Sequence, residues 1–181
     1  MKIFVLTTGQ RVLNDSYNQI DYELFVDETH NKDRCYLELL RYVKAMDEDI
    51  LILEDDVILC KNFKTRLENV VNTYPNDIIN FFWAVRKRPK EIFVERFTSG
   101  FCYTQCVYYP KDSINKFFDK LVNVRNYPYD SNINQALMGA KMSFISYRPA
   151  LVQHIDDDSL IQKGSYIKRV SQVFIDDIER E

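Results

Sequence analysis

The sequence predicts an α/β fold, Rossmann-like, with a mixed, mostly parallel sheet flanked by helices. Residues 50–53, Ile-Leu-Ile-Leu, form an unbroken run of apolar β-formers, which is typical of an inner strand buried on both faces. Segments with apolar residues at helical spacing, such as 30–45, alternate with further short runs of β-formers. Together these patterns favour a layered α/β domain over an all-helical or all-β one.

The expected elements follow in chain order. Strands are expected at residues 2–6, 22–26, 50–53, 77–83, 97–109 (interrupted at Ser99-Gly100) and 142–147. Helices are expected at 30–45 after a Thr29 cap, at 62–73 between an Asn62 cap and Pro75, at 112–122, and after Asp130. Residues 165–180 carry an amphipathic pattern and are expected to pack as a C-terminal helix on the body or on a second copy, which leaves a homodimer open.

Length and composition restrict the class of protein. A chain of 181 residues is expected to form a single domain, residues 1–181, with a full core. Its net charge of −3 gives no bulk electrostatic argument for nucleic acid or anionic membrane. The four cysteines lack zinc spacing and mark no disulfide framework, and no stretch has the length of a signal peptide or membrane span. A cytoplasmic protein is therefore expected.

An acidic turn directly follows the inner strand. Glu54, Asp55 and Asp56 stand where residues 50–53 end, and ligand crevices of open α/β sheets lie beyond the carboxyl ends of strands. Adjacent carboxylates repel one another, and a divalent cation offsets that repulsion. Hard oxygen ligands of this kind suit Mg²⁺ or Mn²⁺. The alternative is a solvated acidic turn without a ligand.

The same residues resemble a known family. The stretch LILEDDVIL, with the helical segment from Asn62, is similar to the metal-binding core of GT-A-type glycosyltransferases, most closely the lipopolysaccharide galactosyltransferase and N-acetylglucosaminyltransferase branches. The resemblance, over roughly residues 2–160, implies a GT-A fold. It implies that Asp56 binds Mn²⁺ or Mg²⁺, which in turn binds the diphosphate of a nucleotide-sugar, and that Glu54 and Asp55 hold the ribose.

Candidate nucleotide contacts lie in the first segments of the chain. The turn of small residues after the first strand allows close approach of a ligand, and it is equally an ordinary strand-to-helix turn. The resemblance implies contacts to the base and ribose from this turn and from the end of the second strand. Arg11 is close enough in sequence to reach a phosphate. The positive charges of Lys32 and Arg34 oppose the dipole of the expected helix 30–45, so a nearby anion such as a nucleotide diphosphate would offset that cost. The candidates are Thr7, Thr8, Gly9, Arg11, Asp27, Lys32 and Arg34. For Lys32 and Arg34, solvated surface charge is the competing interpretation.

Sugar and acceptor contacts are expected later in the chain. The resemblance places the donor sugar against the segment that contains Thr98, Ser99, Gly100 and Gln105, whose aromatic neighbours are also typical core residues. Residues 86–90, Arg-Lys-Arg-Pro-Lys, form a basic loop that is either solvated or directed at an anionic acceptor.

Asp130 has two interpretations. It stands just before a helical pattern, where an N-cap belongs. The resemblance places an acidic residue at this point, and in inverting members of the family that residue takes the proton from the acceptor hydroxyl. The two roles are compatible only if the carboxylate faces the cleft.

His154 is the second candidate metal ligand. A lone histidine is commonly structural, but residues 149–159 resemble the family pattern PxLVQHxGxxS, in which the histidine completes the metal shell. Pro149, Leu151, Val152, Gln153, His154 and Ser159 match this pattern, and Asp156 replaces its glycine. Asp156 begins a run of three aspartates that either adds ligands or faces water.

These expectations combine into one function. The resemblance implies a metal-dependent hexosyl- or N-acetylhexosaminyl-transferase that uses a nucleotide-diphosphate sugar, UDP-linked, and inverts the anomeric carbon. A retaining mechanism needs no such base and stays open. The acceptor, whether glycan, protein or nucleic acid, is not legible in the sequence. Two alternatives are the same chemistry on a hydroxymethylated DNA base and a catalytically inactive nucleotide-sugar-binding protein.

Overall fold

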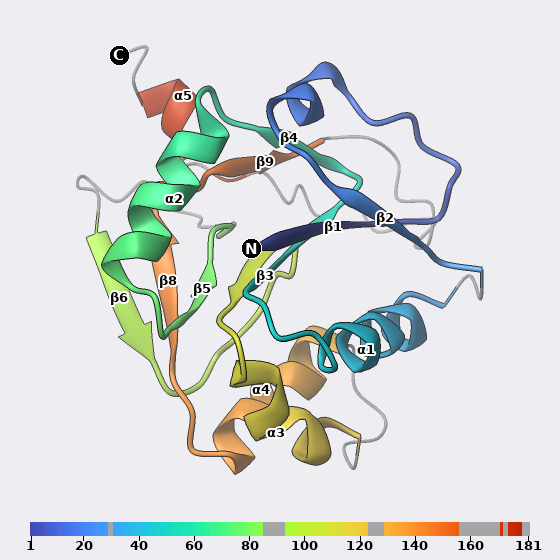
Figure 1. The fold of residues 1–181 in the computed structure, drawn as a ribbon. Coiled ribbons are helices and arrows are strands. Elements are labelled where there is room, and N and C mark those ends of the chain that lie inside the picture. The colour runs from blue at the N-terminus through green and yellow to red at the C-terminus, as the bar shows by residue number, and fades with distance from the viewer. Residues whose placement is uncertain (29–30, 85–92, 123–128, 156–170, 172–173, 179–181) are drawn as a thin grey trace.

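A seven-stranded sheet forms the centre of the molecule. The computed structural model describes residues 1–28, 31–84, 93–122, 129–155, 171 and 174–178 (Figure 1). Across the sheet the strand order is β2 (Glu23–Val26), β1 (Lys2–Thr7), β3 (Ile50–Glu54), β7 (Cys106–Tyr109), β5 (Ile78–Asn80), β8 (Phe144–Arg148) and β6 (Phe93–Phe97). β7 and β6 run against the other strands. The predicted mixed, mostly parallel α/β sheet is thus confirmed.

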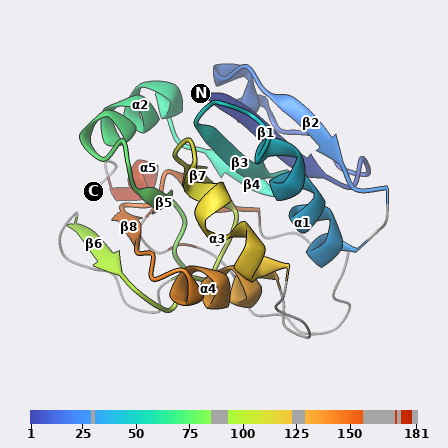
Figure 2. The same ribbon diagram turned by 60° about the horizontal axis from the view of Figure 1, so that its bottom comes forward.

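Helices cover both faces of this sheet. α1 (Lys32–Val43), α3 (Ser113–Leu121) and α4 (Tyr129–Gly139) lie side by side on one face (Figure 2). The other face carries α2 (Phe63–Thr73), the short α5 (Ile175–Ile178) and the 3-10 helix η1 (Asp15–Gln19). Among the described residues, no helix combines the length and the apolar character that a bilayer crossing requires.

The position of β3 between two helical layers explains why residues 50–53 are apolar without interruption. Ile50 and Ile52 belong to the core beneath α1, α3 and α4, whereas Leu51 and Leu53 belong to the core beneath α2. Because successive side chains of a strand point to opposite faces, a strand between two helical layers needs apolar residues at every position. Residues 50–53 are all buried, as the sequence predicted, and the strand continues to Glu54, whose burial the sequence analysis did not expect.

A separate two-stranded ribbon stands beside the main sheet. β4 (Val57–Leu59) pairs antiparallel with β9 (Val152–His154), and Val57 lies opposite His154. The sequence analysis expected neither strand. This ribbon brings the segment after β8 against the turn that follows β3.

Several predicted element boundaries were wrong by a few residues. The N-cap of α1 is Asn31, whose side chain accepts a hydrogen bond from the Arg34 amide, and not Thr29. Asn62 does precede α2, but in a left-handed conformation (φ 56°) and without a capping hydrogen bond. Asp130 is not an N-cap, because α4 already includes Tyr129 and Asp130 lies in its first turn.

Some predicted features lie outside the described residues. These are Thr29, the basic loop at 86–90, the aspartates at 156–158, Ser159, and residues 165–170, 172–173 and 179–180 of the expected C-terminal helix. Within that expected helix, the structure describes α5 and the buried residues Ser171, Phe174 and Ile175. Phe174 forms a parallel bridge with Ala150 next to β9.

Candidate functional site

The candidate site lies at the edge of the sheet where β1, β2 and β3 end. Leu6 lies opposite Glu54, and Thr7 opposite Val26, so the segments after these three parallel strands meet at one edge. The chain turns at Asp55 and Asp56 to enter β4. This edge is where an α/β sheet places its ligands.

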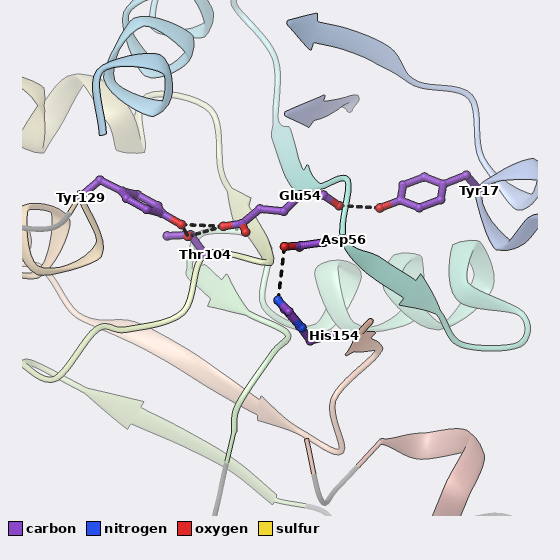
Figure 3. A network of polar contacts seen from close by, with 6 residues as sticks. All are labelled: Tyr17, Glu54, Asp56, Thr104, Tyr129 and His154. Carbon is purple, nitrogen blue, oxygen red and sulfur yellow. Dashed lines mark hydrogen bonds and ion pairs between the residues drawn. The ribbon is translucent and has the colours of Figure 1, made fainter. Parts of the chain in front are cut away.

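The carboxylate of Glu54 points into the protein. Glu54 is only 3% exposed, and its Oε1 accepts hydrogen bonds from Thr104 Oγ1 and Tyr129 Oη, both at 2.7 Å (Figure 3). Its backbone carbonyl accepts a third from Tyr17 Oη at 2.5 Å. Burial, with the charges of Asp56 and Asp55, raises the pKa of Tyr17 far above its ordinary value, so this hydroxyl remains a donor. Glu54 thereby anchors the acidic turn.

Asp55 is held by the turn after β1. Thr7 Oγ1 donates to Asp55 Oδ2 at 2.5 Å, and the Asp55 amide donates to the Leu6 carbonyl at 3.1 Å. Burial raises the pKa of Asp55 above its ordinary value, and the neighbouring charge of Asp56 acts in the same direction. The hydrogen bond from Thr7 and the positive charge of Arg11 oppose this shift without cancelling it. A cation at this turn would relieve the cost of ionising Asp55.

The turn at Thr7, Thr8 and Gly9 is compact. The Gly9 amide donates to Thr7 Oγ1 at 2.9 Å, and Gly9 has φ +73°, a left-handed conformation that favours glycine. Thr8 Oγ1 is buried and has no hydrogen-bond partner within the described part of the chain. Buried hydroxyl groups are normally paired, so this atom is available to a ligand or a water molecule.

The two residues predicted as metal ligands lie next to each other. Asp56 Oδ2 is 3.2 Å from His154 Nε2, and the two side chains are 18% and 15% exposed (Figure 3). The Ile155 amide donates to the Asp56 carbonyl at 2.8 Å, and Val57 is in register with His154. The β4–β9 ribbon therefore fixes this contact through the backbone.

The donor set at this point is a carboxylate and an imidazole. Among the residues that the structure describes, no group of three or more acidic, histidine or cysteine side chains is placed to hold a metal ion. Two protein ligands are compatible with Mg²⁺ or Mn²⁺, because Mg²⁺ is usually held by one or two carboxylates together with water and substrate phosphates. The residues present thus suit a cation that a diphosphate completes.

Asp130 is half-buried in the first turn of α4, and its Oδ1 accepts a hydrogen bond from the Ser131 amide at 2.7 Å. Burial and the negative charge of Asp130 together raise the pKa of Cys102 to about 11, which places the carboxylate beside the segment that leads into β7. That segment also contains Thr104, a partner of Glu54. Asp130 therefore stands on the same side of the sheet as Glu54.

Two other residues predicted to contact the nucleotide, Asp27 and Arg34, interact instead with other residues of the protein. Asp27 is 5% exposed and lies beside Cys35, whose pKa is raised to about 12 by burial and by the charge of Asp27. The Asp27 amide donates to the Thr7 carbonyl at 2.7 Å, so Asp27 supports the turn after β1 from behind. Arg34 forms an exposed ion pair with Glu38 one helical turn along α1, at 2.9 Å.

The predicted sugar-contact residues divide into two groups. Thr98, Ser99 and Gly100 are exposed, and Gly100 has φ +83° with open space where a side chain would stand. Gln105 is 2% exposed, and its backbone carbonyl accepts from the Glu54 amide at 3.1 Å. Its side-chain oxygen has no hydrogen-bond partner in the described residues.

Sequence reasoning missed the residues that hold the site in place. Tyr17, Thr104 and Tyr129 all contact Glu54. Of these, only Tyr129 carries a sequence signal, since it directly precedes Asp130. Gln153, matched only as part of a pattern, binds the backbone of Ser171 through both its amide oxygen (2.7 Å) and its amide nitrogen (2.9 Å).

One comparison with a solved structure supports the fold. No family model matches this chain, and no curated protein sequence matches it. Among solved structures, the apo form of UDP-glucose pyrophosphorylase is 10% identical, covers 81% of this chain and 72% of its own, and superposes with a TM-score of 0.45. A197 from STIV is 14% identical, covers 92% of this chain and 99% of its own, and superposes with a TM-score of 0.57. The chain therefore shares its fold with A197 from STIV over nearly the full length of both proteins.

Proposed function

We propose that this protein is a metal-dependent glycosyltransferase that transfers a hexosyl or N-acetylhexosaminyl group from a UDP-sugar to an acceptor hydroxyl, with inversion. The observation that carries the proposal is the contact between Asp56 and His154 at the mouth of β3. Both residues were predicted as cation ligands, and the two come from segments far apart in the sequence. The contact brings both predicted ligands to one point, as a shared cation would require.

The nucleotide half of the site is assigned to the neighbouring strand ends. The unpartnered Thr8 hydroxyl, the Gly9 turn and the positive charge of Arg11 lie beside Asp55. A ribose offers hydroxyl groups to Thr8 and Asp55, and a diphosphate attracts Arg11. Glu54 is buried against Thr104 and Tyr129, so we assign it to the support of the turn and not to the ribose.

The chemistry requires a base and a stabilised leaving group. Asp56 and His154 would hold the cation, which would offset the negative charge that develops on the departing diphosphate. Asp130 accepts the proton of the acceptor hydroxyl while the acceptor oxygen bonds to the anomeric carbon. The bond from that carbon to the diphosphate oxygen breaks in the same displacement, which inverts the configuration. UDP and the glycosylated acceptor are the products.

Calorimetric titration of UDP in the presence of Mn²⁺ tests the proposal. The wild-type protein is expected to bind UDP with Mn²⁺ and to lose this binding when EDTA is added. Asp56→Ala is expected to abolish the Mn²⁺-dependent binding. Asp119→Ala removes an 87% exposed carboxylate on α3 and serves as the matched control with unchanged affinity. Equal Mn²⁺-dependent affinity in the wild-type and Asp56→Ala proteins would refute the proposal.

A further inference from the structure

Three side-chain oxygens form a closed group between α4 and the acidic turn. Glu54 Oε1 lies 2.7 Å from both Tyr129 Oη and Thr104 Oγ1, and the two hydroxyl groups are 2.5 Å apart (Figure 3). Hydrogen bonds in a buried setting are stronger than bonds between the same groups in water. The group therefore resists separation of the elements that carry it.

The ring of Tyr129 is fixed as well as its hydroxyl. It packs on the ring of Tyr36, with centroids 5.0 Å apart. Tyr36 is fully buried in α1, and its hydroxyl lies 3.1 Å from that of Tyr109. Tyr129 is thus held at both ends, and its hydroxyl cannot leave Glu54 without disturbing the aromatic core.

The same contact joins the two candidate functional segments. Glu54 is directly followed by Asp55 and Asp56, whereas Tyr129 is directly followed by Asp130. Tyr17 holds the backbone of Glu54 independently through a hydrogen bond to its carbonyl. Glu54 therefore cannot shift freely to follow a displaced Tyr129. A single hydrogen bond between residues 75 positions apart therefore relates the first turn of α4 to the acidic turn.

We propose that Tyr129 is a positioning residue. Through Glu54 it holds the first turn of α4, and with it Asp130, at a fixed separation from the turn that carries Asp56. The inference rests on the proposed function, in which Asp130 and Asp56 act on opposite ends of one displacement. Reactions of this kind are sensitive to placement, since a shift of about 1 Å can lower turnover about 100-fold.

The first test separates placement from binding. Tyr129→Phe keeps the ring on Tyr36 but removes the bond to Glu54. We expect kcat to fall about 10-fold or more, while the affinity for UDP with Mn²⁺ stays within about twofold of wild type. Tyr36→Phe removes a buried tyrosine hydroxyl from the same aromatic stack whose hydrogen bond goes to Tyr109, and is expected to keep kcat near wild type. A kcat for Tyr129→Phe equal to that of Tyr36→Phe would overturn the proposal.

The second test needs no catalytic activity. Amide hydrogen exchange at residues 54–57, followed by mass spectrometry, is expected to speed up in Tyr129→Phe and to stay unchanged in Tyr36→Phe. Equal exchange rates in the two variants would show that Tyr129 does not hold the acidic turn through Glu54. If wild type shows neither UDP binding nor transfer, the proposed function fails, and the exchange experiment still decides whether Tyr129 holds the turn.

A second variant guards against a folding defect. Circular dichroism shows whether Tyr129→Phe is folded. If it is not, Thr104→Val provides the comparison, because it removes the other hydroxyl that donates to Glu54 Oε1. It is expected to speed up exchange at residues 54–57, and unchanged exchange would count against the proposal.

Discussion

Thr7 Oγ1 donates a hydrogen bond to Asp55 Oδ2, and the same oxygen accepts one from the Gly9 amide. A threonine at the end of β1 thus orders both the acidic turn and the turn that is expected to meet the nucleotide. Its hydroxyl therefore connects the two turns.

Thr7→Val is expected to destabilise the fold, because it removes the hydroxyl that bonds both the Gly9 amide and the Asp55 carboxylate. We expect the free energy of unfolding in urea to fall by about 1–3 kcal/mol. Thr73→Val is the matched control, since its hydroxyl lies exposed on α2 and donates only to the Asn69 carbonyl; it is expected to change stability by less than about 0.5 kcal/mol. Equal effects of the two substitutions would contradict the role assigned to Thr7.

The raised pKa of Asp55 predicts a pH dependence of stability in the absence of metal. Between the ordinary pKa of an aspartate, about 4, and the raised value, the folded state holds more protons than the unfolded state. The free energy of unfolding contributed by Asp55 therefore falls as pH rises through this window. Asp55→Asn should remove the fall.

Urea unfolding of wild type and Asp55→Asn between pH 3.5 and 7 measures this effect. The variant should gain stability relative to wild type as pH rises. The gain should stay below about 1 kcal/mol, because Asp55 is partly exposed and water screens its charge. A difference that does not change with pH would show that burial of Asp55 does not oppose its ionisation.

Asp130→Asn should separate chemistry from binding. We expect transfer and slow hydrolysis of the UDP-sugar to fall about 100- to 10,000-fold, because the amide cannot accept the proton of the acceptor. Mn²⁺-dependent binding of UDP should persist in calorimetry. Asp112→Asn is the matched control, since Asp112 is an exposed residue just before α3 in a conformation that asparagine also adopts. Unchanged turnover in Asp130→Asn would remove Asp130 from the mechanism.

His154→Ala tests the proposed role of His154 as the second cation ligand. The affinity for UDP with Mn²⁺ is expected to fall about 10-fold or more in calorimetry, because one of two protein ligands is lost. Affinity for UDP in EDTA should be the same in both proteins. A variant that keeps the Mn²⁺ dependence of wild type would show that the histidine only packs against Asp56.

Local patterns in the sequence were sufficient for the layered fold but not for the order of its strands. The apolar run of β3 predicts burial on both faces because period-two side chains meet a helix layer on each side. The position of β7 between β3 and β5, opposite in direction to both, depends on tertiary pairing that no local pattern records. The β4–β9 ribbon was missed for the same reason.

The acidic turn was predicted as a unit, whereas the structure divides it. Glu54 continues the alternation of Ile50 and Ile52, so its side chain falls on the α1 and α4 face, where Thr104 and Tyr129 receive it. The alternation along the strand was legible in the sequence and would have separated the side chain of Glu54 from that of the next residue, Asp55. The contact between Asp56 and His154 was legible only through the resemblance, because two distant segments must meet to form it.

Gln153 and His154 are consecutive residues of β9, and their side chains leave the strand on opposite sides. His154 contacts Asp56, whereas Gln153 hydrogen-bonds to the backbone of Ser171. The Ser171 hydroxyl in turn donates to the Trp83 carbonyl at 2.9 Å. The far end of the polypeptide is thereby tied to the strand that presents the imidazole. Removing the chain from Ser171 onward would take these hydrogen bonds away together with the buried side chains of Phe174 and Ile175. The position of β9, and with it the contact between His154 and Asp56, would then change.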